Sequence, residues 1–294
     1  MFELRRLRML HELALRGTLA AVAEALSYSP STISQQLAQL EKDAGVPLLI
    51  ADGRRVRLTD HGEALAAHAA QALDLEERIR GELEAIRPGI APVRVAAMQT
   101  TAQAIVPRTL TLLRDCAPDL RVELAEVPPE EGLFELAARG FDLVIAEQYP
   151  GHTRAHHAGL LREPLGNDPI RLALPTGDRA RRLADLRDRA WVAEPAGTAS
   201  RQWMQQQCRA AGFEPDVRFE FADLTAHVRL VAAGHAVGLL PDLLGAGQEP
   251  AVRLFDLPGA PVREIFTAVR RSSGARAGIR VVRDALREAF ASPA

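Results

Sequence analysis

Residues 18–40 read TLAAVAEALSYSPSTISQQLAQL, and this stretch decides the fold of the N-terminal part of the chain. Its apolar residues recur every three or four positions on both sides of a short polar break, which is the spacing of two short amphipathic helices. Thr18 and Ser29 carry hydroxyls suited to capping helix N termini, and Pro30 fits a first helical position because its missing N–H would be unpaired there. The stretch therefore predicts two helices separated by a tight turn, with the second ending near Asp43.

The flanking segments extend this pair of helices into a larger head. Leu4 to Arg16 places its apolar residues on one helical face, which predicts a helix before the pair. After the pair, an Asp-Gly turn at residues 52–53 precedes alternating polar and apolar residues at 55–58, as in an exposed hairpin strand. Residues 1–59 are therefore expected to form a winged helix-turn-helix.

A long helix is predicted next, from Asp60 to about Ile86, because the segment contains no proline and begins with the capping-box pair Asp60 and Glu63. Its apolar residues follow steps of four and three, interrupted at Glu76, and this spacing suits packing against a partner helix. The predicted seam consists of Leu65, Ala69, Ala72, Ile79, Leu83 and Ile86. The proline- and glycine-containing stretch at residues 87–92 then predicts a linker, so residues 60–90 are expected to be a dimerising helix and hinge.

From Val93 onward, short β-rich runs alternate with helical patterns, which is typical of an α/β fold with parallel strands. Strands are predicted at residues 93–97, 121–127, 142–146, 170–174, 191–193, 217–221, 236–240 and 265–269. Helices are predicted at residues 102–115, 131–139, 200–211, 224–233 and 277–290. The overall fold class is therefore α/β with a mostly α-helical head.

The helix that begins at Pro30 has the clearest functional pattern. If Ile33, Leu37 and Leu40 face inward, the outward side carries short polar residues, among them Ser31 and Gln35. A glutamine side chain can both donate to and accept from an adenine edge, and hydroxyls near a helix N terminus suit phosphates. Every surface helix has a polar outer face, but the tight helix before this one and the arginine-bearing hairpin after it favour entry into a DNA major groove.

These residues resemble a known family. The run from Thr18 to Leu40, then Gly45-Val46 and the stretch RVRLTDHG at residues 55–62, is similar to the N-terminal signature of LysR-type transcriptional regulators. Chain length and strand–helix alternation extend the resemblance over essentially all 294 residues. One departure is the stretch LLIA at residues 48–51, where the family usually has phenylalanine followed by a basic residue. Arg54 is our candidate to replace that phosphate contact.

The resemblance implies sequence-specific binding to double-stranded DNA. The residues that it assigns to DNA binding are Thr18, Ser29, Pro30, Ser31, Thr32, Ser34, Gln35, Gln36, Arg54, Arg55 and Arg57. It also implies that the long helix pairs two chains, that the dimer recognises a pseudo-palindromic operator, and that tetramers can form.

The resemblance further implies that residues 91–294 form an effector-binding domain with two lobes, like a periplasmic binding protein. Lobe I would comprise about residues 91–163 and 268–294, and lobe II about residues 164–267. In such folds a ligand binds beyond the carboxyl ends of strands, where helices begin. The candidate effector-binding residues are Thr100, Thr101, Glu147, Thr198 and Ser200. Hydroxyls at two helix N termini would suit a carboxylate or other small anion, although Thr101 and Thr198 can equally be simple helix caps and Glu147 can be solvated.

Bulk composition limits the remaining possibilities. The formal net charge is −2, and no apolar run reaches the roughly 20 residues of a transmembrane helix. The first eight residues are rich in arginine and do not resemble a signal peptide, so we expect a cytoplasmic protein. Cys116 and Cys208 form no CxxC pair, which leaves two reduced thiols as the simple interpretation and a redox switch as the alternative.

Two other classes of protein are alternatives to a regulator. A metal-dependent enzyme would need the cluster His152, His156 and His157, which lies in a Gly-, Thr- and Ala-rich loop without an adjacent acidic ligand. A solute-binding protein would account for the lobes but leave the helical head unexplained. No glycine-rich phosphate loop and no G-x-S-x-G nucleophile motif occurs in the sequence, so we expect neither enzymatic activity nor a cofactor.

Overall fold

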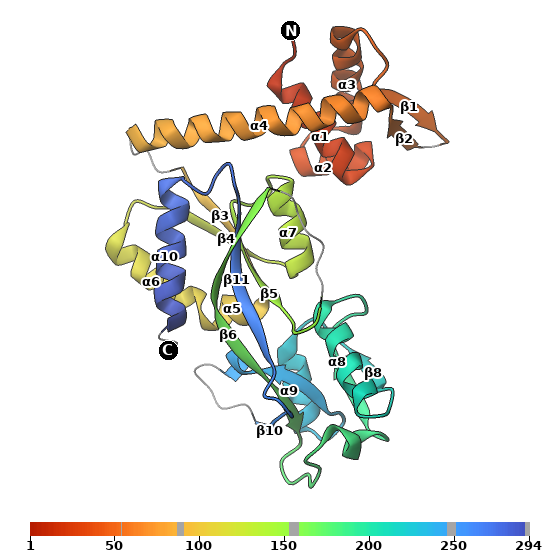
Figure 1. The fold of residues 1–294 in the computed structure, drawn as a ribbon, viewed down its shortest axis with the longest axis vertical. Coiled ribbons are helices and arrows are strands. Elements are labelled where there is room, and N and C mark those ends of the chain that lie inside the picture. Colours follow the sequence, from red (N-terminus) through yellow and green to blue (C-terminus); the bar gives the residue numbers. More distant parts are fainter. Residues whose placement is uncertain (54, 87–90, 153–158, 246–250, 292–294) are drawn as a thin grey trace. The chain divides into compact units, whose positions relative to one another are not determined.

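The computed structural model describes residues 1–53, 55–86, 91–152, 159–245 and 251–291. The chain divides into two compact units. The first comprises residues 1–89 with the short segments 137–140 and 271–277, and the second comprises the rest. Each unit is described by itself below, with the element labels of Figure 1.

The N-terminal unit contains the helices and the hairpin that the sequence predicts. Its elements are α1 (Leu4–Arg16), α2 (Leu19–Leu26), α3 (Pro30–Ala44), β1 (Leu49–Asp52), β2 (Arg55–Leu58) and α4 (Asp60–Ile86). The Thr18 hydroxyl accepts a hydrogen bond from Ala21 N at 3.2 Å, and the Ser29 hydroxyl accepts one from Thr32 N at 3.1 Å. Both predicted N-caps are therefore confirmed.

The helices of the head enclose one hydrophobic core. Leu10 of α1, Val22 of α2, and Ile33 and Leu40 of α3 are completely buried in it. The same core takes in Ala69 from α4, so the beginning of the long helix is part of the head. Burying these side chains fixes which face of α3 points outward.

The start of α4 differs from the predicted capping box. Gly62 N donates to the hydroxyl of Thr59 at 3.0 Å, and that hydroxyl donates to the carbonyl of Pro47 at 2.8 Å. Thr59 is therefore the N-cap, one residue earlier than predicted. Gly62 packs so closely against the backbone just before β1 that a Cβ on this residue would be 2.2 Å from the carbonyl oxygen of Leu48.

The predicted helix seam is wrong for its first half. Leu65, Ala69 and Ala72 pack against the core of the head and are not available to a partner helix. The second half of α4 does expose an apolar row at steps of four, four and three residues. Its members are Leu75 (51% exposed), Ile79 (46%), Leu83 (61%) and Ile86 (80%). We call these four residues the α4 row.

The second unit contains nine described strands and six α-helices. The strands are β3 (Val93–Ala97), β4 (Val122–Glu126), β5 (Leu143–Gln148), β6 (Leu160–Leu174), β7 (Ala190–Ala193), β8 (Asp216–Glu220), β9 (Gly238–Pro241), β10 (Arg253–Asp256) and β11 (Val262–Arg270). The helices are α5 (Gln99–Ala104), α6 (Val106–Cys116), α7 (Pro129–Ala137), α8 (Ala199–Ala210), α9 (Leu224–Ala232) and α10 (Ala277–Ala291). Two short 3₁₀ helices, η1 (Leu183–Leu186) and η2 (Asp242–Gly245), complete the unit.

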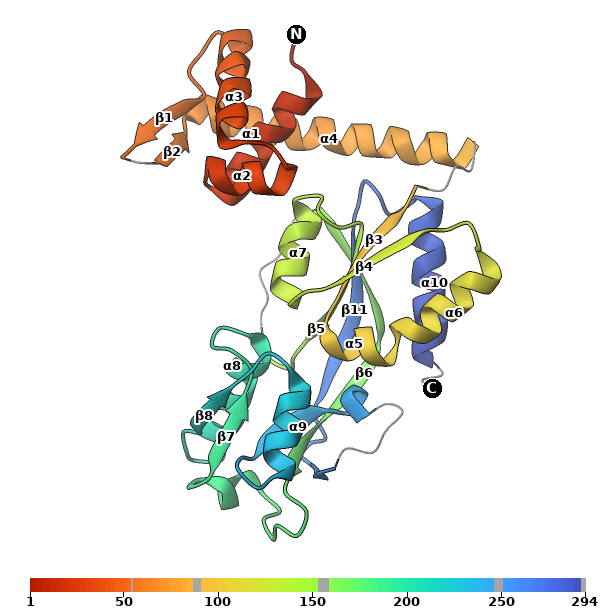
Figure 2. The same cartoon turned by 180° about the vertical axis from the view of Figure 1, so that it is seen from behind.

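The unit has two lobes, which Figures 1 and 2 show from opposite sides. In one lobe, α6 and α10 cover one face of the sheet and α7 covers the other, each over its own hydrophobic core. In the other lobe, α8 packs over a core around Trp191 and Trp203, and α9 packs over a core around Val231. The lobes are joined by β6 and β11, which run side by side through both.

The strand directions correct the prediction of a parallel sheet. The main sheet has the order β10-β6-β11-β5-β3-β4, and β9 also pairs with β6. Strand β3 is parallel to β4 and β5, and β7 is parallel to β8, but β11 is antiparallel to both β5 and β6. Residues 160–169 of β6 pair with β11, whereas residues 170–174 pair with β9 and β10. The change of partner marks where this strand passes from one lobe to the other.

Three element predictions in this unit are also wrong. The single predicted helix at residues 102–115 is two helices, α5 and α6, which meet at Ile105 just before Pro107. The predicted strand at 170–174 is only the end of the 15-residue β6. The first half of β6 contains Pro164 and Gly166, which are typical of loops, so the sequence did not predict a strand there. In the structure, Gly166 lies against α10, and a Cβ at this position would be 2.2 Å from the Phe290 ring. Strand β10 was not predicted.

Candidate nucleic-acid interface and ligand cavity

The outward face of α3 carries short side chains in a continuous stripe. Ser31, Ser34, Gln35, Ala38 and Lys42 are exposed, at spacings of three and four residues. The stripe offers hydroxyl, amide, methyl and ammonium groups, which are the groups that contact base edges and phosphates in a major groove. Ala38 was not among the predicted residues, and its methyl suits contact with a thymine methyl.

A cluster of hydroxyls lies at the N terminus of α3. The Ser29 hydroxyl is 2.8 Å from that of Ser31 and 2.8 Å from that of Thr32. Pro30, the first residue of the helix, is exposed beside them. Since a helix N terminus carries partial positive charge, this cluster suits a phosphate oxygen of DNA. Thr18 is half-buried and caps α2, so its hydroxyl is already used in the fold.

The two adjacent glutamines of α3 have different surroundings. Gln36 is half-buried and its Oε1 accepts from Arg6 Nε at 3.1 Å, so it ties α3 to α1. Arg6 Nη1 also donates to Asp43 at 2.7 Å. The hydrogen bond from Gln39 to Asp43, at 3.0 Å, and the charge of Arg6 lower the pKa of that carboxyl. Gln35, in contrast, is exposed.

The β1–β2 hairpin corresponds to the predicted wing. Asp52 and Arg55 are paired across it, and the side chain of Arg57 is exposed. Arg54 lies outside the described residues, so the structure does not place the phosphate contact proposed for it.

A cavity of about 280 Å³ lies in the second unit, where strands end and helices begin. Its lining comes from both lobes. The residues are Met98, Gln99, Thr100, Glu126, Val127, Pro128, Pro129, Glu130, Glu147, Glu194, Pro195, Thr198, Ala199, Ser200, Ala222, Leu224 and Arg263. Most of them follow the carboxyl ends of β3, β4, β5 and β7, the positions at which ligands bind in folds of this kind.

Four of the five predicted effector residues line this cavity, namely Thr100, Glu147, Thr198 and Ser200. Thr101 does not line it. It is fully buried, and its hydroxyl donates to the carbonyl of Met98 at 3.0 Å, so it acts within the turn. Thr198 both lines the cavity and caps α8, since it accepts from Arg201 N at 3.3 Å. Glu147 is buried rather than solvated.

Arg263 lines the cavity and is not among the residues predicted from the sequence. Its Nε and Nη2 donate to Asp168 at 2.9 and 2.7 Å, its Nη2 donates to the Thr100 hydroxyl at 2.8 Å, and its Nη1 pairs with Glu147. Burial opposes the charge of Arg263, but the surrounding acids raise its pKa overall. Burial also raises the pKa of Asp168, against the opposite influence of Arg263. Only folding brings these residues together, so no local spacing could have revealed them.

Glu194, directly after β7, is the other unpredicted residue. Burial, together with the nearby charge of Glu147, raises its pKa to about 7, while a hydrogen bond from Ser200 and the charge of Arg263 act in the opposite direction. The carboxyl therefore titrates near neutral pH, unlike an ordinary glutamate.

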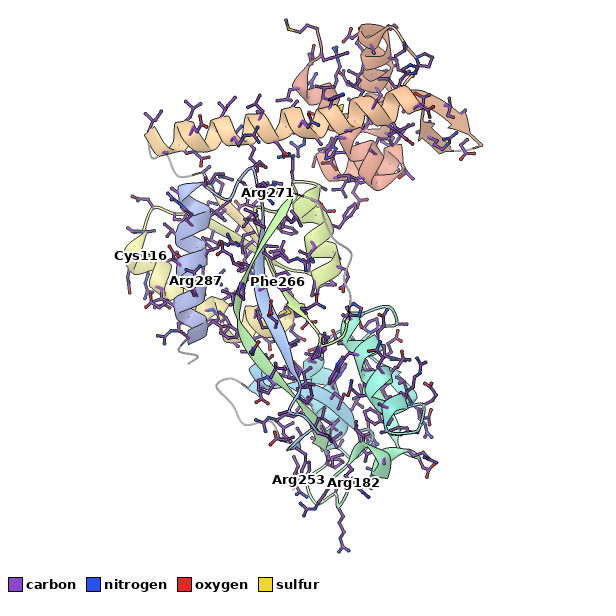
Figure 3. The ribbon with its side chains drawn as sticks, in the orientation of Figure 1. Cys116, Arg182, Arg253, Phe266, Arg271 and Arg287 are labelled. Carbon is purple, nitrogen blue, oxygen red and sulfur yellow. The ribbon has the colours of Figure 1, made fainter. Side chains whose placement is uncertain are left out.

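The cysteines lie in different surroundings. Cys116 is exposed at the end of α6, where Figure 3 labels it, and Cys208 is buried in α8. Both are free thiols. Burial raises the pKa of Cys208 to about 12, which makes it unreactive as a thiolate.

The histidine cluster considered for a metal falls mostly outside the described residues, which include His152 but not His156 or His157. Within the described ranges, no group of three histidine, cysteine or acidic side chains is arranged to hold a metal ion. Across the same ranges, no helix has both the length and the apolar character to span a bilayer.

A helix-turn-helix head with a wing, a long helix and a two-lobed unit with a cavity together define the class: a DNA-binding regulator with an effector-binding domain. Residues 4–63 match the family described as bacterial regulatory helix-turn-helix protein, lysR family, and residues 90–291 match the LysR substrate binding domain. The protein belongs to the LysR family of transcriptional regulators.

Known proteins similar to this chain are named as regulators. The malonate utilization transcriptional regulator of Klebsiella pneumoniae is 28% identical over 251 residues, covering 82% of this chain and 80% of the relative. The transcriptional dual regulator GltC of Bacillus subtilis is 27% identical over 254 residues, covering 84% and 83%. A full-length OxyR variant from Pseudomonas aeruginosa has the same fold, with a TM-score of 0.67 at 22% identity over 98% of this chain and 95% of its own.

Proposed function

We propose that the chain regulates transcription by binding operator DNA through α3 and a small-molecule effector in the cavity that Arg263 lines. The observation that carries the proposal is the exposed polar stripe of α3 on a head whose core fixes its direction. In this proposal Ser31, Ser34 and Gln35 contact base edges, and the hydroxyls at the start of α3 contact phosphates.

The wing supplies further backbone contacts in this proposal. Arg57 is exposed on β2, and Arg54 and Arg55 stay predictions from the resemblance. A solved complex of the LysR regulator CbnR with its target DNA, at TM-score 0.52 and 24% identity over 97% of this chain and 100% of that one, supports the proposal that this fold binds duplex DNA.

We also propose that the active species is a dimer on a pseudo-palindromic operator, and that dimers can assemble further into tetramers. The exposed α4 row supports pairing, because four large apolar side chains along one helix are unusual on a surface that stays in water. Two heads related by a twofold axis require two half-sites.

We propose the functional division predicted from the sequence: residues 1–59 for DNA binding, 60–90 for pairing and 91–294 for effector binding. The lobe limits near residues 163 and 267 remain predictions as well. We propose that the protein acts in the cytoplasm, where bacterial DNA is found, and that it has no enzymatic activity.

The DNA-binding proposal is tested with the full-length protein and fluorescent duplexes from the region upstream of its own gene. Fluorescence anisotropy measures the affinity as the salt concentration is raised. Specific binding should exceed binding to a scrambled duplex by about a thousandfold or more, and the logarithm of the affinity should fall linearly with the logarithm of the salt concentration. Equal affinity for both duplexes would refute the proposal.

A further inference from the structure

The charged side chains that line the cavity are mostly acidic. Among the residues that the structure describes, the lining contains Glu126, Glu130, Glu147 and Glu194, and Arg263 is its one arginine. A ligand that enters such a lining meets a negative potential unless the arginine outweighs the carboxylates. The ligand charge that the cavity favours therefore depends on whether Arg263 is already paired with groups of the protein itself.

Arg263 is already engaged in hydrogen bonds and ion pairs within the protein. Its Nε, Nη1 and Nη2 donate to Asp168, Glu147 and Thr100, and the side chain is 3% exposed. Two carboxylates thus share one guanidinium, which leaves this buried group with a net negative charge. A ligand carboxylate could bind Arg263 only by displacing Glu147 or Asp168, and that would leave a buried anion without a partner.

Glu194 has no such partner among the described residues. The neighbouring guanidinium of Arg201 donates to the main-chain oxygen of Glu194 at 3.3 Å, not to its carboxyl, and forms its ion pair with Glu220 at 3.9 Å. Within the described part of the chain, no arginine, lysine or histidine forms an ion pair with the Glu194 carboxyl, which has the Ser200 hydroxyl beside it. A half-buried carboxyl at a cavity wall, without a cation, is an incomplete ion pair.

The helix N termini at the cavity contribute positive potential, which opposes that of the glutamates but is weaker. A helix N terminus is equivalent to roughly half a positive charge. Two of those at the cavity are already met by the protein's own acids: α7 has Glu130 and Glu131 in its first turn, and α9 is capped by Asp223. With Glu130 at the α7 N terminus and Glu147 paired with Arg263, Glu126 and Glu194 are the further carboxyls among the described lining residues, and they keep the potential there negative.

We propose that the effector carries a protonated amine and that the Glu194 carboxylate binds this ammonium group, with Glu147 contributing to the negative potential. This inference rests on the proposed effector function of the cavity and replaces the carboxylate or other small anion expected from the sequence. A carboxylate elsewhere on the same ligand is compatible with it, because the recognised group is the amine. The raised pKa of Glu194 supports the inference, since an incoming cation would restore its ionised form.

The test uses the full-length protein and probes matched in shape but not in charge. One set is cyclohexylmethylamine, cyclohexylmethanol and cyclohexanecarboxylate, and a second is pentylamine, pentanol and pentanoate. Calorimetric titration at pH 7.5 measures binding. We expect an amine to bind more tightly than its matched alcohol and carboxylate. Glu194→Gln should weaken amine binding by about tenfold or more, because it removes the charge and keeps the shape.

Two control variants test whether the charge of a lining residue matters and whether the probes bind in the cavity. Glu131→Gln removes an exposed glutamate from the same region that does not line the cavity, and it should leave amine binding unchanged. Ala222→Trp places a bulky side chain at an exposed position of the lining and should block all probes. Circular dichroism confirms that each variant is folded.

The results that would contradict our expectation distinguish the amine inference from the proposed effector function of the cavity. If a carboxylate binds more tightly than its amine and Ala222→Trp blocks it, the amine inference is wrong while the cavity remains the effector site. Equal amine binding by Glu194→Gln and the wild type, or no amine binding at all, also overturns the inference. If probes bind equally well to Ala222→Trp, the cavity is not the effector site and that part of the proposed function fails.

Discussion

Arg263 and Asp168 form an ion pair in which both side chains are almost inaccessible to water, at 3% and 1% exposure, with 2.7 Å between Nη2 and Oδ2. Arg263 lies on β11 and Asp168 on β6, the two strands that run through both lobes. Asp168 also accepts from Leu243 N at 2.9 Å, while Arg263 donates to Thr100 and pairs with Glu147. The pair therefore ties β6 and η2 to the cavity residues Thr100 and Glu147.

We predict that Arg263→Met destabilises the protein by about 3–5 kcal/mol, because it leaves two buried carboxylates without a cation. The triple variant with Asp168→Asn and Glu147→Gln should recover part of that loss. Urea unfolding followed by tryptophan fluorescence measures this, since Trp191 and Trp203 both lie in the core of the neighbouring lobe. A wild-type midpoint in Arg263→Met would contradict the structural importance of the pair.

The pKa of Glu194 predicts a dependence of stability on pH. Its value rises from 4.5 in the unfolded chain to about 7 in the folded one, so the folded state binds this proton more tightly. The contribution of Glu194 to stability is therefore fully present below the unfolded pKa and is lost as the pH rises through about 7, a change of roughly 3 kcal/mol. The neighbouring charges are Glu147 on β5, Glu130 on α7 and Arg263 on β11.

The measurement compares urea unfolding of the wild type and of Glu194→Gln between pH 5 and pH 8. Groups remote from Glu194 titrate alike in both proteins, so the difference between the proteins reports Glu194 and the groups coupled to it. We expect the wild type to lose stability relative to Glu194→Gln as the pH rises. A constant difference over this range would show that Glu194 titrates as an ordinary carboxyl.

The sequence predicted the head almost completely because its signals are local. Thr18, Ser29 and Pro30 are helix-start signals read within a few residues, and α3 begins at the predicted residue. The cavity could be predicted only in part. Hydroxyls after predicted strands pointed to Thr100 and Thr198, but the partners of Arg263 are 95 to 163 residues away in the sequence.

Strand direction was the other limit, for a related reason. The alternation of strands and helices is the same whether β6 and β11 run parallel or antiparallel to their neighbours, because direction is set by pairing and not by local pattern. The half of β6 with Pro164 and Gly166 is a strand because β11 pairs with it and Phe290 covers it. Such tertiary contacts override local propensity.

Gln35→Ala should reduce discrimination between operator and random DNA by about 1–3 kcal/mol while leaving stability unchanged, because the side chain is exposed and able to contact a base edge. Anisotropy titrations with both duplexes measure the ratio of affinities. Gln39→Ala is the matched control, since that glutamine bonds to Asp43 within the head. Unchanged discrimination in Gln35→Ala would remove Gln35 from base recognition.

Thiol chemistry should be confined to Cys116. We expect a thiol reagent such as DTNB to modify one thiol in the native protein and both after unfolding, because Cys208 is buried and its pKa is raised to about 12. Cys116→Ser should abolish the native reaction. Fast reaction of Cys208 in the folded protein would instead favour the redox interpretation of the cysteine pair.

The α4 row predicts that Leu83→Glu weakens self-association. Leu83 is 61% exposed in the single chain, so a glutamate there costs little within the fold, but a charge buried between paired helices is unfavourable. Sedimentation equilibrium should show at least a tenfold weaker dimer, roughly 1.4 kcal/mol or more. Glu82→Leu, at the exposed neighbouring position, is the control and should leave the assembly unchanged. If Leu83→Glu associates like the wild type, the dimer forms through another surface, and the α4 row requires a different partner.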